Sequence, residues 1–290
     1  MHCLSSGVHL DENESSFIIN NLSVKVPSIT FNQIRCGEWE KIDINIILEL
    51  LKIGVIYKID TSIHVHWSHL CKQLIDAIHK ELNSIDSTFF LSKITSGTAN
   101  IEQAKAWVRT MFDFTKLASN HIGHIVNVCN EKGDLQSAKY WERFYNEEKN
   151  HWHIYRNIFT SMGLDITREF DKPPYKEVKD FVDFLKSCAS ISEYHYAALL
   201  YAIEMGPQCD ELHDDPQFYS LVKYYGFSER DVIPLFLHTK LNDDIGHASI
   251  WREVLSKKEN YTKNEADSIL HCAINHINLF KAWMDSLERI

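Results

Sequence analysis

The chain has 290 residues, 44% of them hydrophobic, and a formal net charge of −10, so it is long enough to bury a substantial core in one large domain with an appendage. Only ten glycines and six prolines occur, which favours long helices over an all-β or loop-rich fold. The acidic balance and the lack of a basic patch argue against nucleic-acid binding. No apolar run approaches the ~20 residues needed to cross a bilayer.

The seven cysteines are widely spaced and form no CxxC pair. An odd number at such spacing fits neither a disulfide framework nor a zinc–thiolate site. The N-terminal stretch MHCLSSGVHLDENESS lacks the basic and then apolar layout of a signal peptide. We therefore expect a cytoplasmic protein with no membrane partner.

Residues 1–60 differ in pattern from the rest of the chain. The stretch FIINNLSVKVPSITF has short, partly alternating apolar residues, which predict one or two strands. The stretch KIDINIILELLKIGVIYKI predicts a short helix followed by a strand. We expect 1–60 to form a small N-terminal appendage, available for contact with a partner or carrier protein.

From 61 to 290 the periodicity is helical almost throughout, apart from short loops. Amphipathic segments cover about 62–82, 100–130, 133–163, 173–206, 215–224, 233–258 and 263–288. About seven helices, most of them 20–30 residues long, predict an all-α helical bundle that would carry the functional site.

The segment RFYNEEKNHWHIYRNIF places charged groups on the stripe that should be buried. Glu148 and His151 fall on the same helical face as Trp141, Phe144 and Tyr155. A buried carboxylate is costly unless something positive neutralises it. The simpler alternative for this ExxH pair alone is a solvated glutamate and a core histidine.

A second segment carries a lone glutamate. Glu204 shares a helical stripe with Ala197 and Leu200. It lies close to the end of its helix, where an exposed glutamate would be ordinary, so Glu204 alone does not indicate a site.

A third segment, LHTKLNDDIGHASIWREVL, repeats the combination of an acid and a histidine. Its apolar stripe consists of Leu237, Leu241, Ala248, Trp251 and Leu255. This stripe passes through Asp244, and His247 follows one turn later as DxxH, with Asp243 as an i, i+4 alternative.

Two carboxylate-x-x-His pairs and a lone glutamate on three core helices offer mixed oxygen and nitrogen ligands to one interior. Such ligands are typical of carboxylate-bridged iron or manganese sites in helical bundles. Without metal, Asp244 could form an ion pair with Lys240, one turn earlier. A ferritin-like site would need a further glutamate such as Glu81 or Glu102, and neither lies on a convincing apolar stripe.

The order ExxH, a lone Glu about fifty residues later and DxxH about forty residues further on resembles the heme-oxygenase-like diiron oxidases and oxygenases, relatives of TenA, PqqC and the chlamydial death-domain-associated protein. The resemblance covers about 62–290 and implies a heme-oxygenase-like bundle. The metal ligands that it implies are Glu148, His151, Glu204, Asp244 and His247. That family usually has HxxxDxxH on its last ligand helix, which puts Lys240 at a usual ligand position, and Asp243 and Glu147 are further candidate ligands.

The resemblance implies a non-heme iron-dependent oxidoreductase that uses Fe(II) and O2. Two irons are expected, the second weakly bound because of Lys240. The implied substrate is a small amine-, amino-acid- or fatty-acid-derived molecule, in natural-product or cofactor biosynthesis. A homodimer and an electron-donor or carrier partner are compatible with this function.

Two alternatives remain at this point. One is a cofactor-independent, PqqC-like oxidase, and the other is a non-catalytic, TenA-like binding protein, with Lys240 in place of a metal ligand in either case. A TenA-like hydrolase would need a nucleophilic cysteine, and no cysteine lies in a recognisable motif.

Other residues have simpler interpretations. His121 and His124 form an HxxH without a carboxylate partner, which favours a polar helix face, and His195 is expected to be a core histidine. Four aromatic residues on the ligand stripes are expected to shape the pocket: Trp141, Phe144, Tyr155 and Trp251.

Overall fold

The computed structural model describes residues 2–4, 9–11, 16–19, 22–35, 41–43, 45–47, 50, 56–58, 64–84, 89–204, 209–244 and 247–290. The chain divides into two compact units. We call 1–65 with 261–264 the N-terminal unit, and 66–260 with 265–290 the helical unit. None of the helices in the described ranges is long and apolar enough to cross a membrane.

The N-terminal unit contains short antiparallel sheets. Strand β1 (His2–Leu4) pairs with β5 (Ile56–Lys58). A three-stranded sheet consists of β2 (His9–Asp11), β3 (Ser16–Ile19) and β4 (Leu22–Lys25). In its register Phe17 lies opposite both Leu10 and Val24. Strand β4 and all of β3 except Ser16 lie in the stretch whose alternating pattern predicts them.

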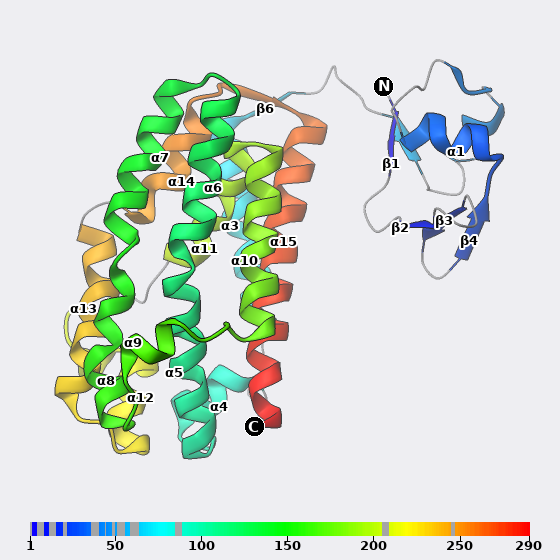
Figure 1. The fold of residues 1–290 in the computed structure, drawn as a ribbon. Coiled ribbons are helices and arrows are strands. Elements are labelled where there is room, and N and C mark those ends of the chain that lie inside the picture. Colours follow the sequence, from blue (N-terminus) through cyan, green and yellow to red (C-terminus); the bar gives the residue numbers. More distant parts are fainter. Residues whose placement is uncertain are drawn as a thin grey trace. The chain divides into compact units, whose positions relative to one another are not determined.

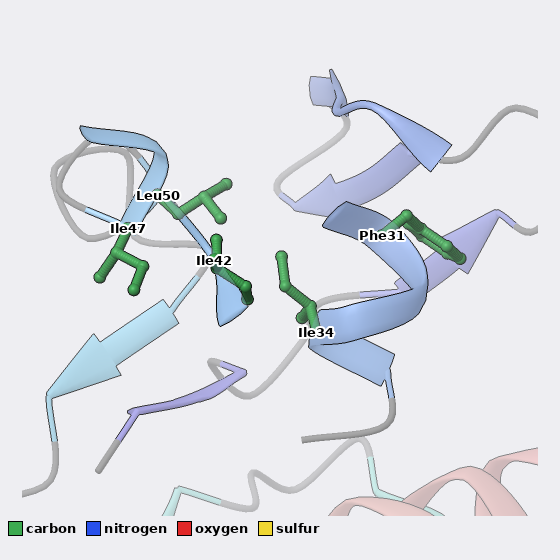
Figure 2. Close-up of a cluster of buried hydrophobic side chains, with 5 residues drawn as sticks. All are labelled: Phe31, Ile34, Ile42, Ile47 and Leu50. Atoms are coloured by element: carbon green, nitrogen blue, oxygen red, sulfur yellow. The ribbon is translucent and has the colours of Figure 1, made fainter. Parts of the chain in front are cut away.

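A small hydrophobic cluster holds this unit together around α1 (Ser28–Arg35). Figure 2 shows its members, with Ile34 of α1 pointing toward Ile42. The five buried side chains are Phe31, Ile34, Ile42, Ile47 and Leu50. The N-terminal unit therefore has a core of its own.

The helical unit is a bundle (Figure 1). Its longer helices are α3 (Trp67–Asn83), α5 (Ile101–Lys116), α6 (Ala118–Glu131), α7 (Leu135–Glu148), α10 (Lys176–Ile191), α11 (Glu193–Glu204), α12 (Pro216–Tyr225), α13 (Glu229–Asp244) and α15 (Lys263–Ser286). Shorter helices are α4 (Phe90–Ser96), α8 (Arg156–Ser161), α9 (Ile166–Phe170) and α14 (Ile250–Ser256), with 3₁₀ turns η2 (His151–Tyr155), η3 (Leu212–Asp214), η4 (His247–Ser249) and η5 (Leu287–Arg289). Strands β6 (His64–His66) and β7 (Asn260–Thr262) form a two-stranded sheet.

The core of the helical unit lies between neighbouring long helices. Helix α6 packs against α7 and α10, α10 against α11, and α11 against α14. Figure 1 shows α6, α7 and α10 running alongside one another. Its largest fully buried side chains include Trp107, Trp141, Trp251 and Trp283. The all-α bundle that the periodicity predicts is confirmed.

The individual helices are shorter than predicted because the long segments are interrupted. The segment 100–130 divides at Leu117 into α5 and α6, and 173–206 divides at Ser192 into α10 and α11. Ser192 is extended (φ −166°, ψ 162°), and its hydroxyl accepts a hydrogen bond from the backbone N–H of His195. A serine in this conformation starts a new helix, because it satisfies a free N–H at the helix N-terminus.

Candidate metal centre

Glu148 and His151 meet at another interruption. Glu148 is the last residue of α7, and His151 begins the 3₁₀ turn η2. Nδ1 of His151 lies 2.8 Å from Oε2 of Glu148. The carboxylate is buried and the imidazole is half-buried. The predicted interior pair therefore forms although the α-helix does not continue between the two residues.

His247 reaches the same carboxylate from a distant part of the chain. It begins η4, it is 3% exposed, and its ring packs edge-on against Phe144 with the centroids 5.0 Å apart. Its Nδ1 lies 3.1 Å from Oε1 of Glu148, and its Nε2 lies 3.1 Å from Oε2 of Glu147. The structure thus brings the predicted histidine of DxxH to the predicted glutamate of ExxH.

A further histidine, His238, joins this group, and the sequence patterns missed it. Its Nε2 lies 2.7 Å from Nδ1 of His151, and the two rings are edge-on with centroids 4.5 Å apart. One ligand atom each of Glu148, His151 and His238 lies within 4.8 Å of the other two. Two imidazoles and one carboxylate that converge in this way match the donor set of non-heme Fe(II) oxygenases.

His238 faces the cluster because α13 turns a different face inward than predicted. Leu237, on the predicted apolar stripe, is 52% exposed, whereas Val232 and Leu235 are almost fully buried. Lys240 lies on the outer side, with its Nζ 3.0 Å from the backbone oxygen of Asp210. In this structure Lys240 therefore contacts Asp210, and the binding of a second, weaker iron stays a prediction.

Pro234 helps to fix α13 against the segment that carries His151. Pro234 lies inside the helix, one turn before His238. Because proline has no N–H, the carbonyl of Arg230 loses its helical partner. The side-chain amide of Asn157, in α8, donates to that carbonyl at 3.2 Å. The sequence thus joins the two histidine-bearing segments through a carbonyl that the proline leaves free.

Glu204 ends α11 and is buried, on the stripe predicted for it. It lines the same cavity as Glu148 and His238. Burial raises the pKa of Glu204 to about 8, and the negative charge of Glu148 contributes to the rise. Asp243 and Asp244 end α13, but their side chains lie outside the described residues.

The charges of the cluster differ from residue to residue. Burial alone would raise the pKa of Glu148, but the nitrogens of His151 and His247 outweigh burial and lower it to about 2. Burial lowers the pKa of His238 to about 4. The site therefore combines an ionised carboxylate with a neutral imidazole that can offer a lone pair to a metal.

Two buried atoms of the cluster have no hydrogen-bond partner among the described residues. They are Oε1 of Glu148 and Nδ1 of His247, which lie 3.1 Å apart in an orientation that makes no hydrogen bond. Helices α7 and α11 also end at this site, and a helix C-terminus carries partial negative charge. Because buried polar atoms without partners are costly, this donor set fits a divalent cation.

The glutamates of a ferritin-like site lie elsewhere. Glu102 is exposed and pairs with Lys105, with 2.8 Å between Nζ and Oε1. Glu81 faces Lys281, with 3.5 Å between Nζ and Oε2. Neither glutamate is placed as the ferritin-like alternative requires.

A cavity of about 360 Å³ opens beside the cluster. Its wall includes Glu148, Glu204 and His238, and the remainder is mostly apolar and aromatic. Phe144 and Tyr155 line it as predicted. Among the described residues, Trp141 and Trp251 do not contribute to the wall. Trp141 packs against Tyr196 and Trp251 against Tyr201, with centroids 5.2 and 4.8 Å apart.

His238 could have been found from the sequence by following the helix from its start. Val232, Leu235 and His238 form an i, i+3 series whose first two members are buried. The predicted stripe began at Leu237, after the proline, and so selected the wrong face. The burial of His121, at 3% exposure, was also missed.

No protein-family model and no curated protein matches the chain. Among solved structures, a domain of unknown function with a heme oxygenase-like fold from Shewanella denitrificans is similar, with a TM-score of 0.59 and 14% identity over 78% of this chain and 93% of that one. A TenA homologue from Pseudomonas syringae pv. tomato is also similar, with a TM-score of 0.56 and 10% identity over 80% of this chain and 96% of that one.

A CADD-like protein of unknown function from Nostoc punctiforme gives a TM-score of 0.54 and 14% identity over 77% of this chain and 97% of that one. At such low identities, the likeness concerns the arrangement of the helices and not the chemistry. The chain therefore has the heme-oxygenase-like fold that its motif order resembles.

Proposed function

We propose that the helical unit is a non-heme iron oxidoreductase that uses O2 to oxidise a small, mostly apolar substrate. Glu148, His151 and His238 would hold an Fe(II) ion, and His247 and Glu204 would hold a second one, with Asp243 or Asp244. The observation that carries this proposal is the two-histidine, one-carboxylate group at the wall of a cavity large enough for a ligand.

Iron in this site would supply the reduction of O2, and the protein would position the ligands and exclude water. Glu147 accepts a hydrogen bond from Nε2 of His247, which orients that imidazole so that Nδ1 faces Glu148. A carboxylate behind a ligand histidine also makes the imidazole a better donor. Phe144 and Tyr155 keep the adjacent cavity apolar, which protects reactive oxygen species from water.

A TenA-like hydrolase is less well supported. Of the cysteines whose side chains are described, Cys71, Cys129, Cys188 and Cys272 are buried. None of the described cysteines lines the 360 Å³ cavity. Burial raises the pKa of Cys71 and of Cys129 to about 11, so these thiols are poor nucleophiles at neutral pH.

The test is an anaerobic Fe(II) titration of the purified apo-protein, followed by rapid mixing with O2 and optical detection. We expect uptake of two irons per chain and a transient visible absorption after mixing. His151→Asn should reduce iron uptake strongly, because it removes an imidazole that no other described residue replaces. His271→Gln is the matched control, since His271 is an exposed histidine on α15.

No uptake of iron by the wild-type protein would contradict the proposal. The contacts of Glu147 and Glu148 with histidines would then be ion pairs in a protein without metal. The cofactor-independent oxidase and the non-catalytic binding protein would take precedence.

A further inference from the structure

Two buried histidines outside the metal cluster also line the cavity. His121, near the start of α6, is 3% exposed, and His276, in the middle of α15, is 2% exposed. Nε2 of His121 and both ring nitrogens of His276 have no hydrogen-bond partner among the described residues. Buried imidazole nitrogens without partners are costly, so a ligand in the cavity is the natural source of the missing bonds.

The protonation of His121 follows from its neighbour. Its Nδ1 lies 2.7 Å from the hydroxyl of the buried Tyr196. No other described group lies within hydrogen-bond distance of that hydroxyl, so its buried O–H is satisfied only when it donates to Nδ1. A neutral imidazole that accepts at Nδ1 carries its hydrogen on Nε2. His121 therefore presents an N–H donor to the cavity.

Aromatic rings hold both imidazoles in place. His121 stacks on Phe114 with an interplanar angle of 11° and centroids 5.9 Å apart. His276 packs against Phe181 with centroids 4.6 Å apart. Phe114 and Phe181 also contact each other, with centroids 5.5 Å apart. Packed rings of this kind fix the direction of the free nitrogens, as a preorganised binding site requires.

The charge of the wall limits what can bind there. Burial lowers the pKa of His121 and of His276 to about 3, so both are neutral at pH 7. The described wall contains no lysine or arginine, but it does contain Glu148 and Glu204. In the protein without iron, an anionic group would be desolvated there without a counter-charge and near carboxylates, which is unfavourable. The wall instead suits an uncharged group that accepts hydrogen bonds.

The volume limits the size of the ligand. An apolar cavity of about 150 Å³ binds benzene. A cavity of about 360 Å³ therefore accommodates about 12 to 15 heavy atoms.

We propose that His121 and His276 form a hydrogen-bonding subsite for the uncharged polar group, an amide or another carbonyl, of a substrate that is otherwise apolar. This inference rests on the proposed function for the role of the ligand as substrate. The binding preference itself does not require iron, so the two proposals can be tested separately.

The test is isothermal titration calorimetry of the full-length protein with four probes that share a phenylbutyl body. The probes are 4-phenylbutanamide, 4-phenylbutanoate, 4-phenylbutylammonium and pentylbenzene. We expect the amide to bind the wild-type protein about tenfold more tightly than pentylbenzene or the carboxylate, because it gains one or two hydrogen bonds. The ammonium probe should bind more weakly than the amide, because burial of its charge is costly and the N–H of His121 presents a donor to it. Tighter binding of the ammonium probe than of the amide would overturn the subsite, since Glu148 and Glu204 would then select the polar group.

Variants of the two histidines distinguish a role in ligand binding from a role in the packing of the core. His276→Phe keeps an aromatic ring but removes both nitrogens, so the affinity for the amide should fall about fivefold and that for pentylbenzene should change less than twofold. His276→Asn, which can still donate, should restore part of the preference. His121→Phe should act like His276→Phe, and His271→Gln should have no effect.

Equal binding of the amide and pentylbenzene by the wild-type protein would overturn the subsite, and so would failure of all four probes to bind. An equal loss for both probes in His276→Phe would show a structural role only. Fe(II) uptake is measured on the same preparations. A preference for the amide without iron uptake would refute the proposed function and support the subsite. Iron uptake without a preference for the amide would support the proposed function and refute the subsite.

Discussion

The two segments that bring histidines to the cluster are interrupted in different ways. In the first, α7 ends at Glu148 and η2 begins at His151, so the two side chains remain three residues apart and in contact. In the second, His238 lies within α13, and His247 lies beyond the end of that helix, in η4. In the first segment one turn separates the ligand candidates. In the second segment eight residues and a helix end lie between them.

This difference decides how far helical periodicity can predict a site. A single 3₁₀ turn changes the rotation per residue little, and i, i+3 neighbours stay on one face. The end of a helix removes that constraint altogether. The stripe drawn through the second segment therefore assigned Leu237 to the interior, although it is 52% exposed.

The largest effect is expected at the residue that joins the two segments. Glu148 contacts both His151 and His247, so Glu148→Gln removes the negative charge that they share. Fe(II) affinity should fall by about 100-fold or more, since changes even behind the ligands cost 10- to 100-fold. Anaerobic titration of apo-protein measures this change.

The neighbouring glutamate provides the comparison. Glu147→Gln keeps a hydrogen-bond acceptor for Nε2 of His247 and alters a partly exposed side chain. The loss should stay within about tenfold. Equal losses in the two variants would mean that Glu148 is not a ligand.

Much of the fold and part of the site could be predicted from this sequence. The bundle follows from helical periodicity over most of the chain, and the stripe of Trp141, Phe144, Glu148 and Tyr155 is buried as predicted. Glu148, His151 and His247 could be selected because a charged or polar residue on an apolar stripe needs an explanation. That explanation depends only on local spacing, which the sequence contains.

The rest depended on information that local spacing does not contain. The orientation of α13 is fixed by Pro234 and by the bond from Asn157 to the Arg230 carbonyl, 73 residues apart in sequence. His121 and His276 lie 155 positions apart in the sequence, on α6 and α15, and only the tertiary structure brings them to one cavity. Neither has a carboxylate partner that would have drawn attention to it in the sequence.

A further prediction tests which face of α13 points toward the metal cluster. His238→Asn should lower Fe(II) affinity by at least about tenfold, because it removes an imidazole 2.7 Å from His151. Lys240→Met should change the affinity less than twofold, because Lys240 faces Asp210 instead. Iron titration of both variants distinguishes the two faces, and a stronger effect of Lys240→Met than of His238→Asn would restore the face that the sequence stripe predicted.

The smallest effect is expected at the hydrogen bond from Asn157 to the Arg230 carbonyl, which connects the two segments that carry the histidines. Asn157→Ala leaves the Arg230 carbonyl without its side-chain donor, and a hydrogen bond of this kind contributes about 1 kcal/mol to the free energy of unfolding. Thermal unfolding should show a decrease of about 2 °C in Tm. Fe(II) affinity should fall a few-fold, because α13 loses a hydrogen bond that holds it against the segment carrying His151.

The matched control for this variant is Asn146→Ala. Its side-chain amide also donates to a backbone carbonyl, that of Glu142, but both residues lie in α7. The loss of that bond should affect stability alone, because it does not join two segments. If Asn146→Ala lowered iron affinity as much as Asn157→Ala, the link between α8 and α13 would have no special role in placing His238. If only Asn157→Ala did so, a carbonyl left free by a proline would help to set the position of a metal ligand one turn away.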